Sequence, residues 1–439
     1  MHVSQTVSRA SPAAASPETR KYHKAELVLL FFILIMFSEG LLPRLFAAEE
    51  SAEGSPILRL IWLPVYAMTL ALMAWKAKDT AITLLRMPFM VGLLGLAGFS
   101  FLWSIDPALS QRRGIAIVMS TLAGIWIGTR YDWRTLLRTL GLVWITVAVA
   151  GTLTALANPS FGLMDEIHVG AWKGLYYEKN QMGGHMARAA FLCAFLYLMD
   201  KPMRKLWGFG VAISTLMVLM STSKTSLLGL LLGFGILAAA LWMKRGRVTG
   251  LTLTWLGVVT GGTLLGVLIF APEIIFALLG RDPSLTGRTD IWAELAQDIS
   301  ERPALGYGYG SFWMLESEPA YWLRETLEWE APTAHNSWLE VAIALGLTGL
   351  AFLLLDFAVT IWRALRTSID TWMGVFALGV CAQFVLFSIS ESIALTQNSL
   401  VWLTYVIIAA KLANAPGTLL PKRRIRLRRP LRRLPSDAA

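Results

Sequence analysis

Arg288 and His335 lie in one polar segment, residues 272–336, that separates two strongly apolar runs of the chain. A guanidinium stays charged at any ordinary pH and can hold a phosphate or carboxylate group with two parallel hydrogen bonds. A histidine titrates near neutral pH, so it can take a proton from a hydroxyl group or donate one to an anion. Residues of these two types could together stabilise a departing anion and move a proton.

The elements that must position these residues are apolar helices. The chain of 439 residues is 55% hydrophobic and 15% charged, whereas soluble domains carry about 25% charged residues. Its mean hydropathy is +0.56. A spanning helix needs about 20 mostly apolar residues. The pattern predicts an all-α transmembrane bundle of about twelve spans, at residues 25–42, 57–75, 82–103, 114–129, 136–157, 184–199, 206–220, 226–243, 251–270, 337–362, 371–389 and 399–412.

Lysine and arginine alternate between rich and poor loops along these runs, and cytoplasmic loops are the rich ones. The alternation predicts that both termini are cytoplasmic and that residues 272–336 form one large loop on the outer face, the periplasm of a bacterium. Residues 1–24 are then a disordered cytoplasmic tail, residues 25–412 the membrane-embedded domain, and residues 413–439 a basic cytoplasmic tail. We expect a multi-pass protein of the bacterial inner membrane.

Several cations oppose this topological trend, because they fall on the predicted outer side. Arg112 and Arg113 precede the fourth run, Lys179 and the neighbouring Asn180 precede the sixth, and Lys224 sits in a short turn between two runs. A charge placed against the positive-inside bias is a better candidate for binding or chemistry than one placed with it. Lys224 could alternatively be a lysine that extends its charge to the interface from a helix end.

The outer segment should also contain a short helix. Ile291, Leu295 and Ile299 recur at the spacing of one helical face, so residues 290–301 are predicted to form an amphipathic helix, which Pro303 and the following glycines end.

Other function classes lack support. Cys193 and Cys381 both lie inside apolar runs, where small core residues are the expected reading, and the Cys and His spacing resembles no metal site. A Gly-rich phosphate loop followed by Lys-Ser or Lys-Thr is absent from the sequence. We therefore expect no metal, no nucleotide and no other cofactor. The net charge of +10 gathers at membrane-flanking positions, which argues against nucleic-acid binding.

The order and spacing of several short motifs resemble the O-antigen ligase and polysaccharide polymerase superfamily, and among its members the exopolysaccharide polymerases. The motifs are Gly174-x-x-x-x-Lys179-Asn180-x-x-Gly183, Ser-x-Ser-Lys224, Gly287-Arg288-x-x-x-Trp292, Pro303-x-x-Gly306-x-Gly308-x-Gly310-x-Phe312 and His335-Asn336-x-x-Leu339 followed by Gly346 and Gly349. Two positions depart from the pattern: Lys224 stands where Arg is frequent, and Glu178 stands where His is frequent.

The resemblance implies a helical membrane glycosyltransferase that takes a glycan from undecaprenyl diphosphate at the periplasmic face. Cationic side chains beside low-dielectric lipid would neutralise the diphosphate as the glycosidic bond breaks. Arg288 is the first candidate for this role, followed by Lys224 and by Arg112 or Arg113. His335 is the candidate base. Glu391 is either an alternative base or the partner of an outward cation.

The remaining candidates would contact the glycan. Asn336 could orient a sugar or cap a helix. Tyr309 and Trp313 could stack on sugar rings or anchor the chain at the membrane interface. Lys179 and Asn180 belong to the substrate-binding set through the motif that contains them.

These observations predict an exopolysaccharide polymerase that transfers glycan onto another lipid-linked repeat unit. An O-antigen ligase, whose acceptor is the lipid A core, is the alternative within the class. A lipid-linked oligosaccharide flippase or another transporter is the alternative of a different class, for which internal repeats and midspan charges are the usual signs. The expected partners are the undecaprenyl-diphosphate-linked oligosaccharide, membrane lipid, and a chain-length regulator or export complex.

Overall fold

The structure, a computed structural model, describes residues 22–46, 55–75, 77–166, 168–243, 246, 288–328 and 331–415. Helices dominate these ranges, and their β-pairing amounts to an isolated bridge between Leu163 and Trp172. The all-α prediction is confirmed in this form. The predicted span at residues 251–270, the adjoining stretch 271–287 and most of both predicted tails lie outside the described residues.

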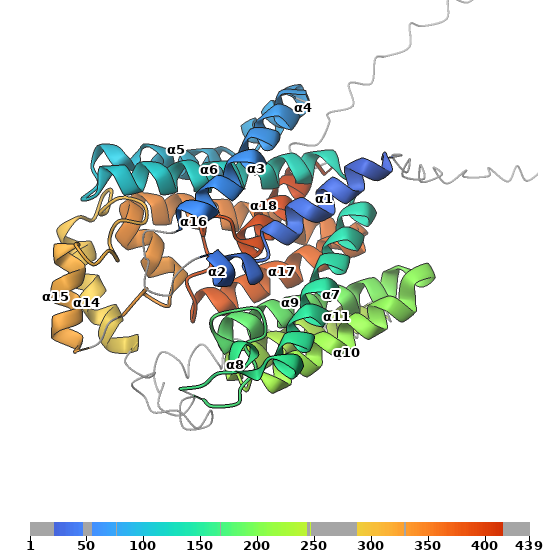
Figure 1. The fold of residues 1–439 in the computed structure, drawn as a ribbon. Helices are drawn as coiled ribbons and strands as arrows, with labels where there is room; N and C mark the ends of the chain where they lie inside the picture. The colour runs from blue at the N-terminus through green and yellow to red at the C-terminus, as the bar shows by residue number, and fades with distance from the viewer. Residues whose placement is uncertain are drawn as a thin grey trace, which may run out of the picture.

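Figure 1 shows the arrangement of the helices, and the longer described connections between them join α8 to α9 and α14 to α15. In chain order they are α1 Lys24–Met36, α2 Leu41–Phe46, α3 Pro56–Trp75, α4 Ala77–Leu85, α5 Pro88–Phe99, η1 Ser100–Leu102, α6 Pro107–Arg130, α7 Trp133–Ala157, α8 Pro159–Gly162, α9 Lys179–Met199, η2 Lys201–Met203, α10 Arg204–Met220, α11 Lys224–Met243, α14 Arg288–Glu301, α15 Glu318–Leu327, α16 Ser337–Asp370, α17 Trp372–Ser388 and α18 Leu400–Ala413.

Within the described ranges, six helical segments are long and apolar enough to cross a bilayer: Pro56–Ala74, Trp133–Ala157, Lys179–Met199, Lys201–Met220, Lys224–Met243 and Ser337–Asp370. The pair Ala77–Leu85 and Pro88–Leu102, bent by 98°, would make a seventh if it counts as one span. On α3, Leu60 and Leu63 are 67% and 58% exposed, as suits a helix whose apolar side faces lipid. The chain is a multi-pass membrane protein, and the count of twelve stays a prediction.

The bundle has two polar ends, which the long helices connect. α6 runs from Pro107 to Arg130 over 24 residues, about 36 Å. At the Arg130 end, Arg130 pairs with Glu26 at 2.8 Å. At the Pro107 end, α6 begins under an Asp106 cap that accepts a hydrogen bond from the Leu109 amide. The segment with the sequence-predicted site residues lies at this second end.

α16 is broken inside its apolar length at Gly346, which has φ 68° and ψ −175°. The break frees backbone carbonyls, and the loop after α14 satisfies them. The amides of Tyr307 and Gly308 donate to the carbonyls of Ile343 and Ala344 at 2.9 and 3.0 Å. In return the Leu347 amide donates to the Pro303 carbonyl at 2.7 Å. Irregular backbone at such a place is tolerated because protein groups pair with it.

The predicted amphipathic helix is confirmed as α14, Arg288–Glu301. Its Ile291 and Leu295 are fully buried in a small core of their own, together with Tyr307, Phe312 and Leu323 from the following loop and α15. Figure 1 shows α14 and α15 side by side at one end of the bundle. These two helices form a cap, in which α14 packs against α16 and the shared core includes Ile343 of α16.

Candidate active site

Arg288, His335 and Glu391 meet at the capped end of the bundle, although 103 positions separate the first from the last (391 − 288). An Nη2 atom of Arg288 lies 3.6 Å from one oxygen of the Glu391 carboxylate, and Nδ1 of His335 lies 3.8 Å from the other. All three side chains are partly exposed, at 15%, 25% and 25%. One carboxylate therefore stands between the predicted anion-binding group and the predicted base.

Local structure holds this cluster in place. The indole N–H of Trp292, one turn along α14 from Arg288, donates to the Ala334 carbonyl at 2.9 Å. His335 follows with φ 46°, a left-handed conformation that is uncommon outside glycine. The Ser337 hydroxyl donates to the Glu391 carbonyl at 2.8 Å. The Arg-x-x-x-Trp spacing thus lets one helix supply an arginine to the site and fasten the loop that carries the histidine.

Asn336 caps α16. Its side-chain oxygen accepts hydrogen bonds from the amides of Trp338 and Leu339 at 3.0 and 3.3 Å. Of the two roles open from the sequence, the structure displays the helix cap, which satisfies donors that a helix start leaves unpaired.

The segment before α9 adds further charges. Partial burial raises the pKa of Glu178, the Glu391 carboxylate raises it further, and Lys173, His335 and Lys179 oppose this. Lys179 is only 6% exposed, and its ammonium donates to the Thr222 hydroxyl at 3.2 Å. Glu178 occupies the position where the family pattern has a histidine, so the structure puts an acid rather than a base within electrostatic reach of His335.

The lysine–asparagine motif and the serine-rich turn are neighbours in space. A Cβ atom on Gly183 would lie 2.5 Å from the Ser226 hydroxyl and 2.8 Å from that of Ser221. Only glycine lets α9 approach the turn this closely. Lys224 is the first residue of α11 and is exposed, beside the turn that Lys179 contacts. Asn180 follows Lys179 in the first turn of α9.

Arg112 and Arg113 line a cavity of about 600 Å³ between α2, α3 and α6. Most of its wall is apolar, with Leu58, Trp62, Leu109 and Ile115 among the lining residues. Its polar part is formed by Glu39, Arg59, Arg112, Arg113, Tyr177, Gln181, Gln397 and Asn398. Tyr177 and Gln181 flank Glu178 and Lys179 in the chain, so the cavity adjoins the segment that borders Glu391.

Arg113 also fixes the glycine-rich loop, because its guanidinium donates to the Gly310 carbonyl at 2.7 Å. Gly310 has φ 75°, and a Cβ atom there would lie 2.5 Å from the Arg113 side chain. The glycine spacing of this motif therefore serves close approach to α6 and to the break in α16.

The two aromatic candidates have structural partners. Tyr309 is 7% exposed, packs in the core and donates its hydroxyl to the Leu395 carbonyl at 2.6 Å. The indole of Trp313 donates to the Glu340 carboxylate at 2.8 Å and is partly exposed. The sites of Tyr309 and Trp313 thus differ in access, and the ring of Trp313 is the one that solvent reaches more readily.

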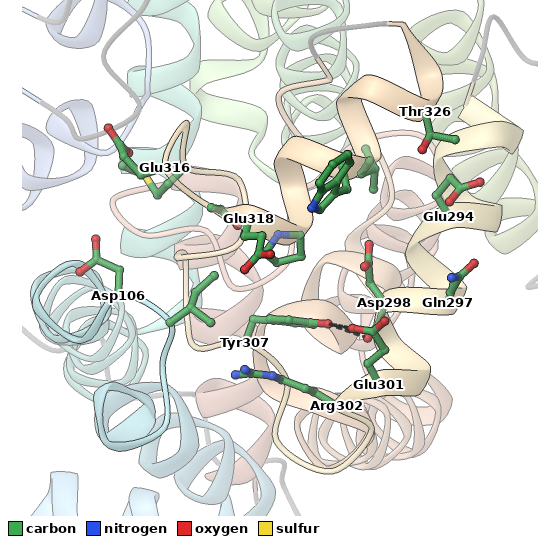
Figure 2. Close-up of a pocket in the computed structure, with 16 residues that line it drawn as sticks. Asp106, Glu294, Gln297, Asp298, Glu301, Arg302, Tyr307, Glu316, Glu318 and Thr326 are labelled. Atoms are coloured by element: carbon green, nitrogen blue, oxygen red, sulfur yellow. Dashed lines mark hydrogen bonds between the residues drawn. The ribbon is translucent and has the colours of Figure 1, made fainter.

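A second cavity, of about 820 Å³, lies between α14 and α15 and has the opposite charge (Figure 2). Glu294, Asp298 and Glu301 line it from α14, Glu316 from the segment before α15, and Glu318 from the first position of α15. Burial raises the pKa of Asp298 to about 7, and repulsion from Glu301 and Glu294 contributes. This acidic cavity is unsuited to a diphosphate.

Three charged residues near the site were not predicted from the sequence. Glu340 accepts hydrogen bonds from the Ala334 amide and from Trp313, and so supports the loop before His335. Glu39 accepts one from the Ser399 hydroxyl at 2.8 Å and lines the arginine-lined cavity. Arg188 lies inside α9. All three sit in apolar runs, and an ionisable residue in such a run is itself the signal that could have found them.

Comparison with known proteins gives two findings. Residues 209–354 match the family described as O-antigen ligase. The exopolysaccharide production protein ExoQ of Rhizobium meliloti (strain 1021) is 26% identical over 273 residues, which are 58% of this chain and 60% of that relative. The alignment thus covers somewhat less than two thirds of the relative's own length.

These findings, together with the helical membrane fold and the assembled motifs, show a membrane protein that resembles the O-antigen ligases. The resemblance to the O-antigen ligase and polysaccharide polymerase superfamily is confirmed. Within that superfamily, the similarity includes a protein of exopolysaccharide production.

Proposed function

We propose that this protein is a membrane glycosyltransferase that extends an exopolysaccharide, moving a glycan from a polyprenyl diphosphate carrier onto a second lipid-linked repeat unit. The observation that carries the proposal is the meeting of Arg288, His335 and Glu391 beside an apolar cavity with arginines at its polar part. The reaction would take place at the periplasmic face of the inner membrane.

The cavity suits the carrier because its two parts match the two parts of such a lipid. The apolar wall would contact the hydrocarbon chain, and Arg59, Arg112 and Arg113 would attract the diphosphate. Charge-assisted hydrogen bonds from arginine to phosphate are strong where water is scarce. The volume of about 600 Å³ lies within the range of ligand pockets, roughly 300–1,000 Å³.

In the proposed step, an acceptor hydroxyl attacks the anomeric carbon of the donor glycan. A new carbon–oxygen bond forms, and the bond between the anomeric carbon and the diphosphate oxygen breaks. His335 takes the hydroxyl proton, and Arg288 with the neighbouring cations neutralises the charge on the departing diphosphate. Glu391 would orient both groups, much as a carboxylate orients the histidine of a hydrolase triad.

Lys224, Lys179 and Asn180 belong to this proposal as ligands of the diphosphate or of the first sugar, and Trp313 as a contact of the glycan. Tyr309 and Asn336 would then act through the backbone they hold. A chain-length regulator or export complex would meet the product rather than the site.

The experiment uses purified full-length protein in lipid nanodiscs with lipid-linked repeat units, and it scores a ladder of longer products. We expect His335→Ala and Arg288→Ala each to lower the rate of ladder formation by at least about 100-fold. His168→Ala and Arg366→Ala are matched controls, because both side chains are exposed and neither belongs to the proposed site. Full ladders from correctly inserted His335→Ala and Arg288→Ala variants would refute the proposal.

An O-antigen ligase is the second candidate, and the matched family description favours it. It would use the same cluster with a different acceptor. Adding lipid A core to the assay separates the two: a ligase transfers one finished chain to that core and makes no ladder.

A further inference from the structure

Arg188 is a charged residue within α9 that the proposed mechanism does not use. Its guanidinium lies over the ring of Phe387, with the carbon 4.2 Å from the ring centroid. Its Nη2 atom is buried and has no hydrogen-bond partner among the described residues. A buried guanidinium with an unused donor is costly, so a bundle that keeps one is expected to gain a function from it.

Phe387 links Arg188 to the reaction site through the backbone. The carbonyl of Phe387, in the last turn of α17, accepts hydrogen bonds from the amides of Glu391 and Ser390 at 2.8 and 3.1 Å. Phe387 therefore contacts the Arg188 guanidinium with its ring and holds the Glu391 amide with its carbonyl. A shift of Arg188 would move the turn that aims Glu391 at Arg288 and His335.

The packing around Arg188 leaves it little freedom. A Cβ atom on Gly184 would lie 3.3 Å from Nη1 of Arg188 and 3.3 Å from the Phe387 ring. On the other side, a Cβ atom on Gly229 of α11 would lie 2.5 Å from the same ring. Two glycines on two helices thus make room for the stacked pair and hold it.

The two carboxylates near Arg188 both have closer partners than Arg188. Glu39 and Glu391 lie on different segments within its electrostatic reach, with Tyr176 and His185 also nearby. Each carboxylate has closer partners: Glu39 has Ser399 and His185, at 2.8 and 3.5 Å. Glu391 has Arg288 and His335. Arg188 therefore acts on Glu391 through its charge and through Phe387, and not as a direct ion-pair partner within 4 Å.

We infer that Arg188 is a positioning residue for the transfer reaction, which holds the Glu391 turn through Phe387 and adds a positive charge within electrostatic reach of the Glu391 carboxylate. The inference rests on the proposed function, since it assigns Arg188 to the same site. Arg188 touches neither the glycan nor the diphosphate, so its loss should change the rate of transfer and leave carrier binding intact.

The test measures initial rates of ladder formation over a range of pH, and carrier binding separately with polyprenyl diphosphate that bears no glycan. Arg188→Gln removes the charge and keeps a similar length. We expect a rate about 10- to 100-fold lower and an unchanged dissociation constant for the carrier. The acidic limb of the pH–rate profile should move to higher pH, because a cation no longer opposes protonation of the site. The charged or titratable groups that face Glu391 are Arg288, His335, Glu178 and Arg188.

Two further variants separate position from charge and cover the case in which Arg188→Gln fails to fold. Arg188→Lys keeps the charge. Its acidic limb should lie at the wild-type pH, whereas its rate should recover only in part. Gly184→Ala presses on Nη1 and the Phe387 ring without changing any charge, so it should lower the rate and leave the limb in place.

Wild-type rates and pH profiles in the variants that fold would overturn the inference, and so would a loss of carrier binding that matches the loss of rate. Failure of the proposed function looks different. In that case His335→Ala keeps its activity whatever Arg188 does, whereas an inactive His335→Ala beside a fully active Arg188→Gln rejects only the role of Arg188.

Discussion

The two polar ends of the bundle use arginine in contrasting ways. At one end, Arg138 holds Asp200 through two hydrogen bonds, and Trp207 donates a third at 3.0 Å to a carboxylate that is 5% exposed. At the other end, Arg288 and His335 share Glu391 at 3.6 and 3.8 Å, with every partner reached by solvent. Short, saturated pairs hold helices together, whereas long, shared pairs between exposed side chains cost little to exchange for a substrate oxygen.

The largest effect should come from the shared carboxylate. Glu391→Gln keeps the shape of the side chain and removes the charge between Arg288 and His335. We expect transfer to fall about 100- to 1,000-fold, by analogy with the carboxylate of a hydrolase triad. The thermal midpoint should stay near that of the wild type. A transfer rate within twofold of wild type would place Glu391 outside the reaction.

At the opposite end the expectation is reversed. Arg138→Ala leaves Asp200 buried with its strongest partner gone, so the free energy of unfolding should fall by about 3 kcal/mol. Arg134→Ala is the matched control, because Arg134 reaches the same carboxylate at 3.6 Å and is 58% exposed. That control should cost less than about 1 kcal/mol. Unfolding in detergent followed by circular dichroism measures both, and equal losses would contradict the contrast.

Arg288→Lys sharpens the contrast within the site. Lysine keeps the positive charge but loses the planar fork that binds phosphate with two hydrogen bonds. We expect transfer about tenfold slower, with stability unchanged. The same exchange at Arg138 should destabilise the fold instead, because the paired hydrogen bonds to Asp200 are lost. Thermal midpoints and ladder assays on the two lysine variants give the comparison directly.

The smallest effect concerns the acidic cavity of the cap. The pKa of Asp298 is raised to about 7, above its ordinary value of 3.8, by burial and by Glu301 and Glu294. The folded cap therefore binds a proton that the unfolded chain releases, and its stability should fall as the pH rises from about 4 to 7. Asp298→Asn should flatten this dependence and raise the thermal midpoint above pH 7. An Asp298→Asn variant whose midpoint follows the wild-type pH curve would show that another group titrates.

Local patterns in the sequence predicted the local structure well. The spacing of Ile291, Leu295 and Ile299 predicted α14, and the helix cap was one of two roles open for Asn336. The motifs also predicted that Arg288 and His335 share a site, and the structure places both against Glu391.

Most other contacts between distant segments could not be predicted from the sequence. The periodicity does not predict the hydrogen bond from the Trp292 indole to the Ala334 carbonyl, or the close approach of Gly183 to Ser226. Sugar stacking and anchoring at the membrane interface were both open for Tyr309, and the burial of its ring was not predicted. The glycines around it bring the loop against α6 and α16 and pack the ring into the core. Arg188 was hidden by the apolar residues around it, since hydropathy averages over a single charge.

The break at Gly346 makes α16 and the loop after α14 depend on each other for backbone hydrogen bonds, although the two are separate elements of the chain. The loop after α14 supplies the hydrogen bonds that the interrupted helix lacks, through Tyr307, Gly308 and Pro303. We expect that neither part can be exchanged alone with a relative's counterpart, because the carbonyls of Ile343 and Ala344 would then lose their hydrogen-bond donors. A chimera designed to change substrate preference should therefore exchange two parts together: the loop after α14, and the stretch of α16 around Gly346.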